Sequence, residues 1–130
     1  MEAVSRGGRR SSEWSEGRIM AIVPSEDPCE ANAFVDIVIP SGMGVMRNAL
    51  IVRSADVVVA VGGGAGTLSE IALAWQMDKP LAALALGEGW SHRMAGVSLD
   101  VRRDGVIEGF EEMGPLLDWI AVTLSSKDDT

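Results

Sequence analysis

A glycine-rich turn carries the residue types in this sequence that could most readily do chemistry. In the stretch VVVAVGGGAGTLSEIALAW, residues 57–75, an apolar run ends in four glycines within five residues and then becomes helical in pattern. Backbone N–H groups at such a turn, beside a helix N-terminus, can bind an anion such as phosphate. Glu70 adds a carboxylate that could be catalytic. The glycines in question are Gly62, Gly63, Gly64 and Gly66.

The start of this helix also has a purely structural interpretation. Thr67 to Glu70, T-L-S-E, has the spacing of a capping box, in which the Thr67 side chain accepts a hydrogen bond from the N–H of Glu70 and Glu70 reaches back to Thr67. Such a cap stabilises a helix by about 1 kcal/mol and needs no ligand. Spacing alone favours the cap, whereas the preceding glycines favour backbone with positive φ or a closely approaching ligand.

Short apolar runs separated by helical segments must position this turn. We expect strands at residues 18–23, 34–39, 56–61 and 81–86, and helices at residues 46–55, 68–77 and 111–124, with a short helix near the start. Residues 56–61, DVVVAV, do not alternate with polar residues, which predicts a strand buried on both faces of a parallel sheet. Residues 87–105 are predicted as mostly loop, with short strands near Val97–Val101 and Val106–Ile107. The pattern predicts an α/β sandwich with a mostly parallel sheet.

Composition excludes several classes of protein. The 130 residues, of which 47% are hydrophobic, predict one domain over residues 1–124 and a charged tail over residues 125–130. A formal net charge of −8 argues against a nucleic-acid binder. With one cysteine, Cys29, and one histidine, His92, we expect no metal site. No apolar run approaches the roughly 18 residues of a membrane span, so we expect a soluble, cytoplasmic protein.

The spacing of the turn is similar to one known superfamily. GGGAGT matches neither the dinucleotide fingerprint nor the P-loop, which argues against a dehydrogenase or an ATPase. The stretch MRNALIVRSADVVVAVGGGAGTLSEIALAW, residues 46–75, resembles the LOG-like, or lysine-decarboxylase-like, superfamily. Its R-N pair ahead of G-G-G-x-G-T-L-S-E looks most like the molybdenum-cofactor-carrier-like branch. The resemblance implies a Rossmann-like three-layer sandwich that binds a small phosphate-bearing ligand.

The resemblance implies a function and a set of site residues. The expected function is binding of a nucleotide or of a phospho-cofactor such as the molybdenum cofactor. The first alternative is a nucleoside 5′-monophosphate phosphoribohydrolase of the cytokinin-activating type, in which Arg47 and Glu70 would be catalytic. Replacement of the superfamily's proline by Val61-Gly62 favours binding over turnover. The implied ligand-binding residues are Arg47, Asn48, Gly62, Gly63, Gly64, Gly66, Thr67 and Glu70.

The resemblance also leads to expectations about the rest of the protein. The superfamily's first strands and glycine loop would precede Met1, so we expect an N-terminally truncated domain and a homo-oligomer. A truncated fragment that only associates with other subunits is the second alternative function. A pyridoxal-phosphate decarboxylase is not expected, because that cofactor needs a lysine for its Schiff base and the lysines, Lys79 and Lys127, are distant from the turn in sequence.

Overall fold

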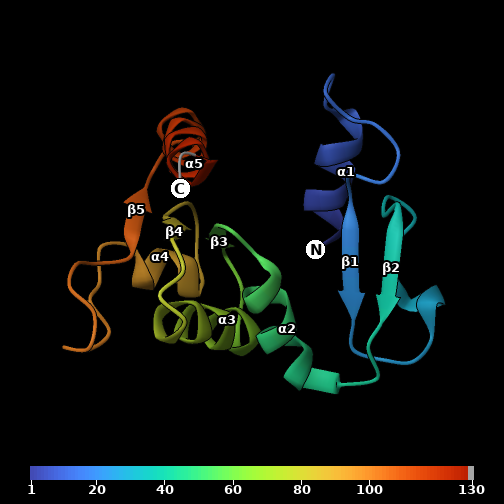
Figure 1. Cartoon of the computed structure of the whole chain (residues 1–130), viewed down its shortest axis with the longest axis horizontal. Coiled ribbons are helices and arrows are strands. Elements are labelled where there is room, and N and C mark those ends of the chain that lie inside the picture. The colour runs from blue at the N-terminus through green and yellow to red at the C-terminus, as the bar shows by residue number, and fades with distance from the viewer. Residues whose placement is uncertain (129–130) are drawn as a thin grey trace. The chain divides into compact units, whose positions relative to one another are not determined.

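The chain forms two compact units with parallel strands in each. The computed structural model describes residues 1–128. The first unit is Met1–Arg47, and the second begins at Asn48. Strands pair in parallel in both units, and helices connect them (Figure 1). The α/β class with parallel strand pairing that we predicted from the sequence is therefore confirmed.

The first unit consists of one helix and two strands. Helix α1 spans Glu2–Arg10, strand β1 spans Met20–Val23 and strand β2 spans Ile37–Pro40. β1 and β2 lie side by side in parallel, with Met20 opposite Ile37 (Figure 1). Two single-turn 3-10 helices, η1 at Pro28–Glu30 and η2 at Gly44–Met46, lie in the connections that follow the two strands.

A buried carboxylate, Asp36, links the segments of the first unit. Its side chain is only 1% exposed, and Arg9 Nη2 lies 2.9 Å from its Oδ1. Its other oxygen, Oδ2, accepts hydrogen bonds from Trp14 Nε1 at 3.1 Å and from the Ile19 N–H at 3.0 Å. Burial alone would raise the pKa of Asp36, but these hydrogen bonds and the Arg9 charge outweigh burial and hold the pKa below its ordinary value. Asp36 therefore joins α1, the following loop and the start of β1.

The second unit is built around a three-stranded parallel sheet in the order β3-β4-β5. Helix α2, Arg47–Ser54, begins at the last residue of the first unit and continues into the second. The other elements are β3 (Val58–Val61), α3 (Ala65–Gln76), β4 (Leu81–Leu84), α4 (Trp90–Met94), β5 (Glu108–Phe110) and α5 (Met113–Asp128). Strands that follow one another in the chain are thus also neighbours in the sheet, as is usual for parallel strands joined by helical connections.

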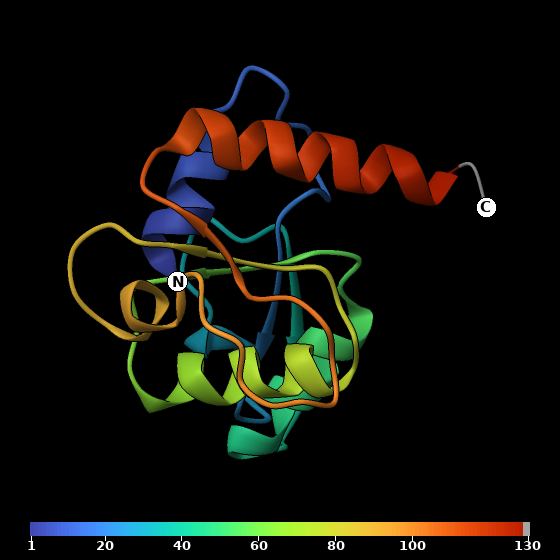
Figure 2. The same ribbon diagram turned by 90° about the vertical axis from the view of Figure 1, so that its left-hand side faces the viewer.

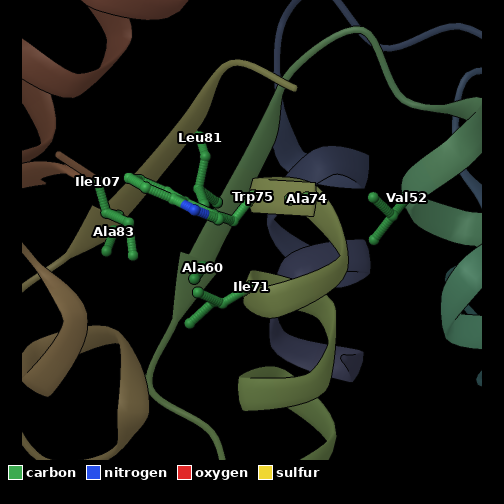
Figure 3. Packing of buried hydrophobic residues seen from close by; sticks show 8 residues of the cluster. All are labelled: Val52, Ala60, Ile71, Ala74, Trp75, Leu81, Ala83 and Ile107. Carbon is green, nitrogen blue, oxygen red and sulfur yellow. The ribbon is translucent and has the colours of Figure 1, made fainter. Parts of the chain in front are cut away.

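Strand β4 is the centre of the second unit's core, because its two faces pack against different helices. Leu81 and Ala83 belong to a cluster with Ile71 and Trp75 of α3 (Figure 3). The alternate residues Ala82 and Leu84 pack instead with Leu116, Trp119 and Ile120 of α5. Figure 2 shows α3 and α5 on opposite sides of the strands. The second unit therefore has helix, sheet and helix layers, as side chains that alternate along a central strand require.

Several predicted elements differ from the structure. The strand buried on both faces is β4, whereas β3 is at an edge of its sheet and only its Ala60 is buried. Residues 97–101 form no strand, and the last strand is Glu108–Phe110 rather than Val106–Ile107. Helix α5 extends through residues 125–128 of the predicted tail, while residues 129–130 lie outside the described part.

We predict that Asp36 makes the stability of the first unit depend on pH. A carboxylate with a lowered pKa in the folded state stabilises fully above its unfolded value, near 3.8, and loses that contribution as the pH falls through the folded value. Asp36→Asn should therefore lower the urea midpoint at neutral pH, and the difference from wild type should shrink below pH 3.8. Urea unfolding followed by circular dichroism at each pH measures these midpoints. Asp118→Asn is the control, because Asp118 is exposed and the substitution removes the same negative charge. A difference independent of pH would contradict the prediction.

Candidate functional site

The glycine turn lies between the end of β3 and the start of α3. Gly62 and Gly63 have φ values of 57° and 84°, the left-handed region that favours glycine. Helix α3 already begins at Ala65. Its N-cap is Gly64, which has no side chain that could accept a hydrogen bond from the first turn. The capping-box interpretation is therefore wrong, because Thr67 is inside the first helical turn rather than at the cap. Its hydroxyl instead lies against Gly63, where a Cβ would overlap it.

A buried serine, Ser91 in α4, fixes this turn to the next strand. Its Oγ accepts a hydrogen bond from the Gly62 N–H at 2.6 Å and donates one to the Leu84 carbonyl at 2.7 Å. Its own N–H donates to the Gly62 carbonyl at 3.1 Å. Ser91 is fully buried, so these groups have no access to water as an alternative. We call this set of bonds the Ser91 clamp.

The loop that follows β4 packs directly on the glycine turn. The Trp90 N–H donates to the Gly63 carbonyl at 3.1 Å. Gly89, at φ 111°, is so close that a Cβ on it would lie 2.7 Å from the Gly62 carbonyl carbon and 2.9 Å from the Gly63 nitrogen. Such contacts require glycine, because no real Cβ approaches backbone atoms that closely. The carboxyl ends of β3 and β4 are therefore joined through two glycine loops.

The clamp leaves a row of backbone donors unused. Within residues 1–128, the N–H groups of the five residues from Gly63 to Thr67 make no hydrogen bond, and the first N–H of α3 to do so is that of Leu68, to the Gly64 carbonyl. Three of these donors belong to the first turn of α3, where a helix has no internal acceptors. Most of this segment is exposed. Five adjacent donors beside a helix N-terminus form a setting suited to an anion.

Arg47 and Asn48, the two predicted ligand-binding residues that precede the turn, both make hydrogen bonds within the protein. Asn48, which is buried, donates from Nδ2 to Ser69 Oγ at 2.7 Å and to the Gly66 carbonyl at 3.5 Å, so it holds α2 against the first turns of α3. Arg47 donates from Nη1 to the Ile22 carbonyl at 2.7 Å within the first unit. Glu70 is half-buried in α3 of the second unit. The pairing of Arg47 with Glu70 at one site stays a prediction.

A shallow depression of about 600 Å³ adjoins the turn. Its wall is formed by the loop after β4 and by α4, and its lining residues are Gly63, Gly87, Glu88, Gly89, Trp90, His92 and Arg93. The Arg93 guanidinium lies over the Trp90 ring, 5.1 Å from its centroid. The sequence interpretation treated this segment as loop and missed Ser91 and Arg93. The signal that could have found them is Gly87-Glu88-Gly89, a second glycine pair directly after a buried strand.

A second hollow, of about 710 Å³, is lined by residues that make hydrogen bonds within the protein. It lies near the end of α3 and the turn before β4, at the opposite end of that strand from the glycine turn. Asp100 there accepts from Trp75 Nε1 at 3.1 Å and from the Arg102 N–H at 3.0 Å. These hydrogen bonds, the one from Trp75 first, lower the pKa of Asp100. The Asp100 carboxylate therefore attaches its loop to α3 and is engaged within the protein.

The two lysine side chains also donate hydrogen bonds within the protein. Lys79 Nζ donates to the carbonyls of Arg53 and Ala55 at 3.0 and 2.7 Å, and Lys127 Nζ donates to the Asp56 carbonyl at 2.9 Å. In the part of the chain that the structure describes, no group of three or more His, Cys, Asp or Glu side chains could hold a metal ion. Over the same residues, no helix combines the length and the apolar character needed to cross a bilayer.

Comparisons with known proteins agree on the kind of fold. The profile of the SLOG cluster4 family matches residues 1–108. An uncharacterized protein of Archaeoglobus fulgidus is 44% identical over 85 residues, which are 65% of this chain and 52% of the relative. The chain thus spans about half the length of that curated relative.

Two solved structures are similar over nearly the whole chain. The crystal structure of TM1055, a structural genomics target, has 31% identity and a TM-score of 0.81, with 92% of this chain and 71% of that chain covered. The molybdenum cofactor binding protein of the phototrophic bacterium Rippkaea orientalis has 30% identity and a TM-score of 0.76, with 95% and 71% covered. The fold shared with these proteins confirms the expected Rossmann-like class.

We predict that the Ser91 hydroxyl stabilises the second unit. Ser91→Ala leaves the Gly62 N–H and the Leu84 carbonyl without their partner, which should cost about 1–3 kcal/mol of unfolding free energy. Urea unfolding followed by circular dichroism measures this loss. Ser98→Ala is the matched control, because the Ser98 side chain is exposed and its change should be within about 0.5 kcal/mol. Equal midpoints for the two variants would contradict the prediction.

Proposed function

The chain belongs to the SLOG cluster4 family, and from this membership and the free donors of the glycine turn we propose that it binds a small phosphate-bearing ligand, a nucleotide or phospho-cofactor, at that turn. The proposed ligand-binding residues are those of the turn together with residues on α2 and α3. They are Arg47, Asn48, Gly62, Gly63, Gly64, Gly66, Thr67 and Glu70.

The single observation that carries the proposal is the row of unused N–H groups from Gly63 to Thr67. A polar N-cap side chain would accept from some of them, but the N-cap here is Gly64, which has no side chain. The Thr67 hydroxyl lies against Gly63. The positive end of the α3 dipole adds to the attraction for a negative group. A phosphate would accept several of these donors at once.

The similar structures support the same class of ligand. The Rippkaea orientalis protein is described as binding the molybdenum cofactor, and it shares its fold with 95% of this chain. A shared fold alone does not transfer a ligand. The glycine turn supplies the independent argument, since its donors suit a phosphate of either a nucleotide or a cofactor. We therefore propose binding without turnover as the function.

The phosphoribohydrolase alternative requires both Arg47 and Glu70 at one site and stays a prediction from the sequence. Incubation of the protein with AMP and with isopentenyladenosine monophosphate tests it, because a hydrolase would release the free base. Base release that disappears in Glu70→Gln would replace binding without turnover as the function. The expected result is ligand binding with no base release. Homo-oligomerisation likewise stays a prediction, and light scattering of the purified chain measures it.

We predict that removal of one turn donor weakens phosphate binding while the helix persists. Ala65 is the first residue of α3, where proline is tolerated, and Gly64 before it, at φ −103° and ψ −149°, is outside the α region that a following proline disfavours. Ala65→Pro therefore deletes one N–H at little cost to the fold. Loss of one charge-assisted hydrogen bond should weaken AMP binding about tenfold in calorimetry.

Ala65→Gly is the matched control for that variant. It changes the same residue but keeps every N–H of the turn. We expect it to bind AMP like the wild type. Equal affinities of Ala65→Pro and Ala65→Gly, with both folded by circular dichroism, would show that the ligand does not use the turn donors.

A further inference from the structure

We propose that Arg93 is a second anion-binding group beside the glycine turn, so that the site prefers a ligand with two linked anionic groups, such as a diphosphate, over a monophosphate. This inference rests on the proposed binding of phosphate by the turn. It concerns residues outside the motif that the sequence singled out.

The first argument is the place of Arg93. It lines the depression of about 600 Å³ whose rim includes Gly63, the first residue with a free turn donor. A ligand with one phosphate on the turn would have its next group over this depression. The second anionic group of a diphosphate is the chemistry that a guanidinium binds best, through paired N–H donors.

The second argument is that the guanidinium is held in position and has no carboxylate partner. It lies over the Trp90 ring at 5.1 Å from the centroid, which restricts its motion. Among residues 1–128, Arg93 makes no ion pair and no side-chain hydrogen bond. By contrast, Arg9 and Arg103 also lie over tryptophan rings, but each pairs with an aspartate. The stacked Arg93 is thus still available to an external anion.

The third argument is that α4 cannot shift independently of the turn. The Ser91 clamp joins α4 to Gly62, and the Trp90 N–H joins it to Gly63. The Arg93 N–H donates to the Gly89 carbonyl at 3.3 Å, and Gly89 itself packs on the turn. The guanidinium and the free turn donors therefore belong to one rigid arrangement, which lowers the entropy cost of a ligand that bridges them.

The same depression contains an opposing charge. Glu88 lines it and, within the described residues, makes no ion pair. Its carboxylate would repel the second anionic group, so a change at Glu88 should act in the opposite direction to a change at Arg93. The two residues provide a paired test in which nonspecific effects of charge can be separated from the proposed contact.

Calorimetric titration with inorganic phosphate and with pyrophosphate tests the inference. The wild type should bind pyrophosphate about tenfold more tightly than phosphate at constant ionic strength. Arg93→Gln should reduce this preference to about twofold with little change in phosphate affinity, and Arg93→Lys should retain an intermediate preference because it keeps the charge but not the fork of donors. Glu88→Gln should increase the preference.

Arg53→Gln is the matched control, since it removes an exposed charge of the same type at the far end of α2. Its pyrophosphate preference should equal that of the wild type. If phosphate binds but pyrophosphate binds no more tightly, or if Arg93→Gln and Arg53→Gln behave alike, the role of Arg93 is overturned while the glycine-turn site stands. If neither anion binds to the wild type, the proposed function itself fails.

Discussion

The rest of the second unit depends on one buried hydroxyl, that of Ser91, because it joins the carboxyl ends of two parallel strands. Strand ends in a parallel sheet finish in loops whose backbone groups have no ladder partner, and burial makes such groups costly. Ser91 accepts from Gly62 and donates to Leu84, so both strand ends are satisfied by a single side chain. Its backbone N–H adds a bond to Gly62. Glycine at positions 62, 63 and 89 is what permits the loops to come this close.

The clamp explains why the glycine turn can be both rigid and incompletely bonded. Gly62 and the Gly63 carbonyl are bonded to α4, whereas the N–H groups from Gly63 to Thr67 make no hydrogen bond to any of residues 1–128. A helix that began with an ordinary cap would have used some of these donors for its own stability. Gly64, the N-cap, has no side chain to do so, and the donors of the first turn are therefore left to water or to a ligand.

Arginines in this acidic chain show how context decides the use of a charge. Three of them stack on tryptophan rings, and two of these three also pair with aspartates and hold loops in place. Arg9 forms an ion pair with the nearly inaccessible Asp36 in the first unit, and this charge, together with the hydrogen bonds from Trp14 and Ile19, compensates the cost of burying the carboxylate. Arg93 has the same stacking but pairs with no aspartate within residues 1–128. The difference between a structural and a ligand-binding arginine is thus the partner rather than the residue type.

The sequence by itself determined the class of fold and the position of the turn, because both depend on local patterns. Apolar runs of strand length predicted β1 to β4 at close to their observed places, and four glycines marked the turn. Only the tertiary structure decided where α3 begins, which strand is central and what Ser91 does. The hydrogen bond between Gly62 and Ser91 joins residues 29 positions apart. A pattern along the chain does not encode such a partner, since its strength comes from burial and geometry that exist only after β3 and β4 have paired.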